Sequence, residues 1–165
     1  MSTLQIIRHG NLSIKDMLDI IDIKCISWPY DPDSQFQWII KNLRENDLHF
    51  LLREKQEGKV LAYLNLVDVE ASFDSGTMIL CWGLGNVCTR EKGTGKGREI
   101  MLLLNDFIIN NNRTAILLCK ERVIGFYKKM GWCEIFNNSA LPSDIHILYC
   151  GKEHIKQLNN LNRIF

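Results

Sequence analysis

A glycine-rich segment at residues 93–97 constrains the fold more than any other part of the sequence. Three glycines alternate there with a threonine and a lysine. An apolar, β-prone run at residues 78–87 precedes the segment, and a run with apolar residues at helical spacing follows it at residues 100–108. Glycines let backbone N–H groups approach an anion, and the helix dipole adds positive potential. The sequence therefore predicts a phosphate-binding turn between a strand and a helix.

Two common nucleotide fingerprints do not fit this turn. The P-loop motif G-x-x-x-x-G-K-S/T requires a hydroxyl residue after the lysine, whereas Lys96 is followed by Gly97. The dinucleotide motif G-x-G-x-x-G requires a wider gap before its last glycine than the one between Gly95 and Gly97. Both interpretations are rejected.

The spacing instead resembles the pyrophosphate loop of the GNAT superfamily of acyl-CoA-dependent N-acyltransferases, whose signature is R/Q-x-x-G-x-G/A. Two registers fit, one beginning at Arg90 and the other at Lys92. Only the second puts Ile100 and Met101 where the family's helix turns toward the core, and it also puts Val87 at the usual strand-end valine. We prefer this register, although Lys92 departs from the usual Arg or Gln and meets phosphate only as a point charge.

This resemblance implies acetyl-CoA, or another acyl-CoA, as co-substrate, without a metal. The residues that it places against the cofactor are Val87, Cys88, Thr89, Lys92, Gly93, Thr94, Gly95, Lys96, Gly97 and Arg98. Gly83 and Gly85 near the end of the preceding strand suggest an opening in which a pantetheine arm could lie. The alternative is a solvated basic turn that binds nothing.

The expected elements follow the order β–α–α–β–β–β–α–β–α–β–β, which is the GNAT order. The fold class is α/β in the α+β sense: a single domain over residues 1–165, with a central mixed sheet flanked by helices. Strands are expected at residues 4–8, 48–53, 60–69, 78–87, 114–119, 132–136 and 145–150, and a loop at 70–76. Helices are expected from Ser13 to Cys25, from after Asp33 to near Asn46, from Ile100 to Ile108, from Glu121 to Met130 and, as a short surface helix, within 153–165. Asp16, three residues after Ser13, is the expected capping-box partner at the start of the first helix. The apolar residues expected to face the core on the first two helices are Ile14, Met17, Leu18, Ile21, Cys25, Phe36, Ile39, Ile40 and Leu43.

A second segment, Phe126–Trp132, resembles the family's F-Y-x-K-x-G-F/W signature. The resemblance implies that Tyr127 protonates the leaving thiolate and that the backbone N–H near Val87 binds the thioester carbonyl. A tyrosine suits this task because its ordinary pKa near 10 keeps it protonated at neutral pH. The alternative is a tyrosine that only packs in the core. No general base is assigned, because residues 78–87 contain no carboxylate and the nearest acids are Asp68, Glu70 and Asp74.

The connection between the first two helices usually frames the acceptor pocket in this family. It contains Trp28 and Tyr30 beside two acids, a composition that can hold a cationic or polyamine-like acceptor. An ordered proline-rich loop whose aromatics cover the core is an equal alternative. The segment from Cys119 to Trp132 leans toward the aminoglycoside-acetyltransferase-like branch.

Composition limits the other function classes. A formal net charge of +1 argues against a nucleic-acid partner, and no apolar run approaches the roughly 20 residues of a membrane span. The six scattered cysteines form no C-x-x-C pair, so we expect reduced, mostly buried thiols in a cytoplasmic protein. Cys88 and Cys119 are weighed as acyl-enzyme nucleophiles, but packing is the preferred role. A homodimer is left open.

The sequence therefore predicts an N-acetyltransferase that moves an acetyl group from acetyl-CoA to a primary amine of a small molecule or peptide, directly in a ternary complex. A non-catalytic acyl-CoA-binding or regulatory module is the alternative.

Overall fold

The computed structural model describes residues 1–74 and 76–165. The chain forms two compact units: the first comprises Met1–Val67 and Asn86–Leu103, and the second comprises Asp68–Gly85 and Leu104–Phe165. Three elements begin in one unit and end in the other, namely β3 (Val60–Phe73), β4 (Met78–Thr89) and α3 (Lys96–Asn110).

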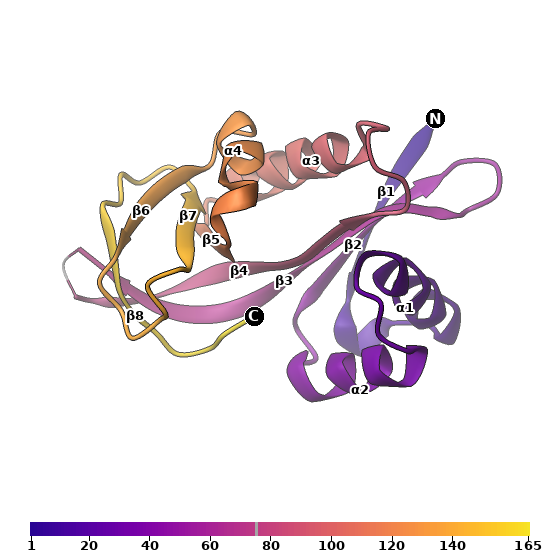
Figure 1. Cartoon of the computed structure of the whole chain (residues 1–165), viewed down its shortest axis with the longest axis horizontal. Coiled ribbons are helices and arrows are strands. Elements are labelled where there is room, and N and C mark those ends of the chain that lie inside the picture. Colours follow the sequence, from indigo (N-terminus) through magenta and orange to yellow (C-terminus); the bar gives the residue numbers. More distant parts are fainter. Residues whose placement is uncertain (75) are drawn as a thin grey trace. The chain divides into compact units, whose positions relative to one another are not determined.

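The first unit contains an antiparallel arrangement of β1 (Ser2–Arg8), β2 (Leu48–Glu54) and the first part of β3 (Figure 1). The register places His49 of β2 directly opposite Asn65 of β3. A short 3-10 helix, His9–Asn11, follows β1. The β2–β3 hairpin confirms the expectation from the sequence.

Two helices, α1 (Ile14–Ser27) and α2 (Pro32–Asn42), complete the first unit and lie side by side (Figure 1). α1 begins with the expected capping box, in which Ser13 and Asp16 exchange side chain-to-backbone hydrogen bonds. The side chain of Asp31 caps α2, whose first residue is a proline. α2 ends about one turn earlier than the sequence predicted.

The prediction of the buried helix faces was wrong in part. Four residues expected in the core are exposed: Ile14, Leu18, Phe36 and Ile40. On α1 the fully buried residues include Ile20 and Ile23. The face of α1 that is buried thus differs from the predicted one. Arg53 of β2 explains the difference, because its guanidinium contacts Asp16 at 2.8 Å and Asp19 at 2.7 Å. These ion pairs draw the acidic side of α1 onto the strand, and the apolar spacing alone could not anticipate them.

The second unit has a mixed sheet, which confirms the predicted fold class. β4 pairs in parallel with β5 (Ala115–Cys119), and β5 pairs antiparallel with β7 (His146–Cys150). β7 pairs antiparallel with β6 (Cys133–Asn137), which runs parallel to β8 (Gln157–Leu161). The helix α4 (Glu121–Lys129) lies between β5 and β6 in the sequence.

The C-terminal segment corrects another expectation. Residues 157–161 form the strand β8, whereas the sequence suggested a surface helix within 153–165. β8 also pairs with residues 71–73 at the end of β3, so most of the expected 70–76 loop is strand. The carboxylate of Asp74 accepts hydrogen bonds from the backbone N–H groups of Lys156 and Gln157. Ser75, within that expected loop, lies outside the described residues.

Over the described residues, no helix is both long and apolar enough to cross a lipid bilayer.

Candidate functional site

The glycine-rich turn has the backbone geometry that an anion site needs. β4 ends at Thr89 and α3 begins at Lys96. Between them Gly93 has φ of 80° and Gly95 has φ of 76°, a left-handed conformation that side chains with a Cβ adopt at a cost. A Cβ added at either glycine would meet no other atom within 4 Å, so the space in front of both is open. The first N–H groups of α3 have no acceptor within the helix, so they are available to bind an anion.

The basic residues of the turn differ in whether they form ion pairs with other residues of the protein. Arg90 is committed to the protein, because it donates to the Val60 carbonyl at 2.7 Å and contacts Asp22 at 2.5 Å. Lys96 contacts Glu99 at 2.7 Å. Lys92 forms no ion pair with any residue that the structure describes and is exposed.

The inward face of α3 agrees with the preferred register. Ile100 and Met101 are completely buried, whereas Arg98 is exposed. Ile100 and Met101 are the positions that the Lys92 register assigns to the core.

A polar network fixes the backbone just before Val87. Asn86 has φ of 54°, which is unusual for a residue other than glycine. Its side chain accepts a hydrogen bond from Lys24 Nζ at 3.0 Å and donates to Asn65 Oδ1 at 2.7 Å. The residue that precedes Val87 is therefore held by hydrogen bonds to two different side chains.

Lys24 of α1 lies between two indole rings of the first unit. Its ammonium nitrogen is 3.9 Å from the ring centre of Trp38 and 5.9 Å from that of Trp28. The side chain is only 2% exposed, and burial lowers its pKa to about 8. Trp28 thus already contacts a cation of its own chain, whereas Tyr30 is largely exposed.

Tyr127 lies on α4 in the second unit and is half-buried. Its ring meets Phe126 edge-on at 5.2 Å. Burial, and to a smaller extent the thiol of Cys119, raises the pKa of Tyr127 to about 12, so the phenol holds its proton at neutral pH. Among the described residues, none is hydrogen-bonded to its hydroxyl.

The cysteines are free thiols, and the structure gives neither candidate nucleophile an activated environment. Burial raises the pKa of Cys88 to about 12. It also raises the pKa of Cys119, with a further contribution from Glu134. Both groups are therefore neutral thiols, which are poor nucleophiles.

Two of the carboxylates that lie nearest in sequence to residues 78–87 interact with other side chains of the protein. Asp68 contacts Arg113 at 2.7 Å, and Glu70 accepts a hydrogen bond from Asn162. The opening expected at Gly83 is also filled, because a Cβ there would lie 2.5 Å from the ring of Phe165.

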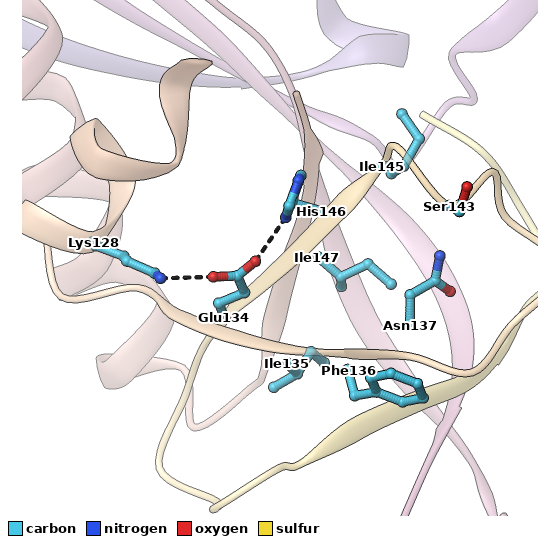
Figure 2. Close-up of a pocket in the computed structure, with 9 residues that line it drawn as sticks. All are labelled: Lys128, Glu134, Ile135, Phe136, Asn137, Ser143, Ile145, His146 and Ile147. Atoms are coloured by element: carbon cyan, nitrogen blue, oxygen red, sulfur yellow. Dashed lines mark hydrogen bonds and ion pairs between the residues drawn. The ribbon is translucent and has the colours of Figure 1, made fainter. Parts of the chain in front are cut away.

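Two features, one in each unit, could not be predicted from the sequence. One is the Lys24–Asn86 contact, which joins residues 62 positions apart. The other is a hollow of about 710 Å³ in the second unit, beside a hydrogen-bonded pair formed by Glu134 and His146 (Figure 2). Neither pair has a local spacing that could reveal it. No cluster of metal-binding side chains occurs over residues 1–74 and 76–165.

No protein-family model matches the sequence, and no curated protein matches it. Solved structures do match. ElaA from Escherichia coli shares 15% identity at a TM-score of 0.67, with 91% of this chain and 99% of that chain covered. A GNAT-family acetyltransferase from Brucella melitensis in complex with acetyl-CoA shares 16% identity at a TM-score of 0.61, covering 99% and 96%. The catalytic domain of a Tetrahymena histone acetyltransferase in complex with coenzyme A shares 14% identity at a TM-score of 0.61, covering 92% and 93%.

These structures confirm the fold that the resemblance implied, without singling out a branch of the superfamily. The chain has the fold of the GNAT acyl-CoA N-acyltransferases.

Proposed function

We propose that residues 1–165 are a single-domain N-acetyltransferase that transfers an acetyl group from acetyl-CoA to the primary amine of a small molecule or peptide. The observation that carries this proposal is the turn before α3, where two left-handed glycines leave open space against the start of a helix. Proteins of the same fold that hold acetyl-CoA or coenzyme A support it.

We propose the following roles, which rest on the family resemblance and on the exposure of the residues at the turn. Lys92 and Arg98 are exposed charges at the turn and meet the phosphates, together with the backbone N–H groups of residues 93–97. The N–H of Val87, held in place through Asn86, polarises the thioester carbonyl. Tyr127 supplies the proton that the departing thiolate needs, and Trp28 and Tyr30 contact the acceptor.

The reaction is a direct transfer in a ternary complex. The acceptor nitrogen attacks the thioester carbonyl carbon, a C–N bond forms and the C–S bond breaks. Tyr127 gives its proton to the sulfur, and the amine loses one proton to a base. The neutral state of Cys88 and Cys119 favours this route over an acyl-cysteine intermediate.

A non-catalytic acyl-CoA-binding module is the second candidate. The observation that favours it is the absence of any carboxylate from residues 78–87. The two functions differ in one measurement, the release of free thiol from acetyl-CoA when an amine is added. A module that only binds acyl-CoA releases none.

Acetyl-CoA binding tests the proposal first. A ligand that binds only the folded state at 100 times its Kd stabilises it by about 2.7 kcal/mol, so saturating acetyl-CoA should raise Tm. Gly95→Glu should abolish the rise, because it puts a negative side chain into the open space before α3.

Gly76→Glu is the matched control. Gly76 has φ of 78° and similarly open surroundings, but it lies between β3 and β4, away from the glycine-rich turn. This variant should pay the same backbone strain and still respond to acetyl-CoA. A wild-type Tm that does not move at saturating acetyl-CoA would overturn the proposed function.

A further inference from the structure

Lys24 of α1 is a buried ammonium group to which the proposed mechanism gives no role. Its side chain is only 2% exposed, and it forms no ion pair with any carboxylate that the structure describes. The indole ring of Trp38 lies against it, and Asn86 Oδ1 accepts a hydrogen bond from it. Burying a charge without a counter-ion costs stability, which argues for a role beyond packing. Lys24, Asn65, Asn86 and Val87 all belong to the first unit.

The charge of Lys24 sets the direction of a chain of hydrogen bonds. An ammonium group only donates, so Asn86 must present Oδ1 to it, at 3.0 Å. Asn86 Nδ2 then donates to Asn65 Oδ1 at 2.7 Å. As a result, the buried Nδ2 of Asn65 has no hydrogen-bond partner among the described residues. A buried donor without an acceptor is unfavourable, so the chain runs in this direction because the charged lysine imposes it.

A neutral Lys24 would remove this constraint. A neutral amine has a lone pair, so it accepts hydrogen bonds as well as donating them. Both amides could then turn over, with Asn65 Nδ2 donating to Asn86 Oδ1 and Asn86 Nδ2 facing the amine. That arrangement gives the unpaired nitrogen of Asn65 an acceptor. The proton on Lys24 therefore selects between two orientations of the Asn86 side chain.

The orientation of Asn86 matters because of its backbone. Its φ of 54° lies in the left-handed region, which residues with a Cβ adopt only where their surroundings hold them there. The hydrogen bonds to Lys24 and Asn65 provide that hold. The peptide that follows Asn86 carries the N–H of Val87. A change at the Asn86 side chain therefore acts on the direction of that N–H.

We propose that protonated Lys24 is a positioning residue for acyl transfer, because through Asn86 it aims the Val87 N–H at the thioester carbonyl. This inference rests on the proposed function and adds the residue that prepares its carbonyl-binding group. Lys24 acts through Asn86 and not on the reacting atoms. Loss of its proton releases Asn86, and the N–H turns away from the carbonyl. The charged form of Lys24 is thus the form that supports transfer.

The proton of Lys24 is lost at mildly alkaline pH, because burial lowers its pKa to about 8. The titratable groups that interact with it are Cys25 on α1, Cys88 on β4 and His49 on β2. The side chain that α2 places against it, Trp38, does not titrate. Burial raises the pKa of both thiols and lowers that of His49 to about 3. A transition near pH 8 in this network therefore belongs to Lys24.

Nuclear magnetic resonance of the Val87 amide tests the proposal. Valine occurs only at positions 60, 67, 69, 87 and 123, so ¹⁵N-valine labelling gives few signals, and Val87→Ile identifies the one from residue 87. In the wild type this signal should titrate with a midpoint near pH 8. Lys24→Met keeps a long side chain without the charge, and its Val87 signal should not titrate between about pH 6 and about pH 9.

Lys41→Met removes an exposed lysine of α2 and is the matched control, which should titrate as the wild type does. A Val87 signal that stays fixed in the wild type, or that moves equally in Lys24→Met, overturns the proposal.

Asn86→Asp is a second variant, which keeps the lysine in the core. Its carboxylate pairs with the ammonium group and accepts from Asn65 Nδ2, so the fold should tolerate it. It should raise the pKa of Lys24 and move the midpoint of the Val87 signal upward by roughly one pH unit or more. An unmoved midpoint would mean that a group other than Lys24 titrates, and the assignment falls.

The thioester carbonyl gives the second readout. Acetyl-CoA labelled with ¹³C at this carbon should shift downfield when it binds the wild type at about pH 7, because a hydrogen bond from an N–H polarises the carbonyl. The shift should be smaller with saturated Lys24→Met, and smaller with the wild type at about pH 9. A lysine that only packed between indoles would leave the carbonyl resonance unchanged.

The outcomes separate the two proposals. If acetyl-CoA binds and its carbonyl resonance is the same in the wild type and Lys24→Met, the positioning role falls and the proposed function stands. If acetyl-CoA neither raises the Tm of the wild type nor gives a bound resonance, the proposed function falls, and this role of Lys24 falls with it.

Discussion

His49, on β2 in the first unit, is a histidine whose side chain is completely buried. One of its ring nitrogens lies 3.0 Å from His9 Nδ1 and the other lies 2.9 Å from the Tyr63 hydroxyl. Burial, followed by the effect of His9, lowers the pKa of His49 to about 3. The ring is therefore neutral at pH 7.

This shift predicts acid sensitivity. The unfolded chain protonates His49 below about 6.5, whereas the folded chain does so only near 3. The unfolded state binds more protons in this window, so the free energy of unfolding falls as pH drops from 6.5 toward 3 and is unaffected above it. The loss is on the order of 5 kcal/mol when complete.

Urea denaturation at several pH values checks this. His49→Gln removes the titrating ring and should give a shallower dependence on pH than wild type, whatever its stability at pH 7. His154→Gln removes an exposed histidine and should retain the wild-type slope. Equal slopes for wild type and His49→Gln would mean that His49 is not held neutral.

Tyr127 carries a second residue-scale prediction. Tyr127→Phe keeps the ring and its edge contact with Phe126 and removes only the hydroxyl. It should lower kcat on the order of 10²-fold while acetyl-CoA affinity stays near wild type, because the hydroxyl acts on the leaving thiolate. Tyr149→Phe, which removes a hydroxyl that accepts a bond from the Ile155 N–H, is the control and should affect stability only. Full activity of Tyr127→Phe would return this residue to a packing role.

Among single residues, the sequence could predict an interaction only where its two partners lie close together in the chain. The Ser13–Asp16 cap joins positions three apart and was predicted correctly. Lys24 was not recognised as a site residue, because its partner Asn86 is distant in the chain and both become neighbours only through folding. The Glu134–His146 pair depends on the β6–β7 register in the same way.

At the scale of elements, the turn between β4 and α3 was predictable because strand, glycines and helix are contiguous. β8 was not, because the three-residue spacing of Ile155, Leu158 and Leu161 favours a helix over a strand. The pairing partners that decide between them lie in β3 and β6, far away in the sequence. Backbone partners distant in sequence thus overrode a local periodicity.

Substitutions of Lys92 and Arg90 at this turn should change two different properties, acetyl-CoA affinity and stability respectively. Lys92→Ala should weaken acetyl-CoA binding roughly 5- to 20-fold, since it removes an exposed charge available to phosphate. Arg90→Ala should instead lower Tm in the absence of ligand by a few degrees, because it loses contacts to Asp22 and the Val60 carbonyl. Asp22→Asn should reproduce part of that loss. Calorimetry that ranks Arg90→Ala as the weaker binder would restore the register beginning at Arg90.

At the scale of the whole molecule, the two compact units share three continuous elements. β3, β4 and α3 each begin in one unit and end in the other. If one unit unfolded alone, the hydrogen bonds of β3, β4 and α3 would be broken partway along each element. The other unit would then lose the support of the elements that it shares. From this connectivity we propose that the whole chain is a single cooperative domain.

The tryptophans provide the test of this cooperativity, because each unit contains two of the four. Trp28 and Trp38 belong to the first unit, and Trp82 and Trp132 belong to the second. A double variant with Phe at 28 and 38 reports the second unit by fluorescence, and one with Phe at 82 and 132 reports the first. Within each variant, the urea transition seen by fluorescence should coincide with that seen by far-UV circular dichroism, because a single cooperative domain loses both signals together. Comparing each variant with itself removes the effect of the substitutions on stability. If fluorescence and circular dichroism give different midpoints in either variant, the units unfold separately and the chain is not one cooperative domain.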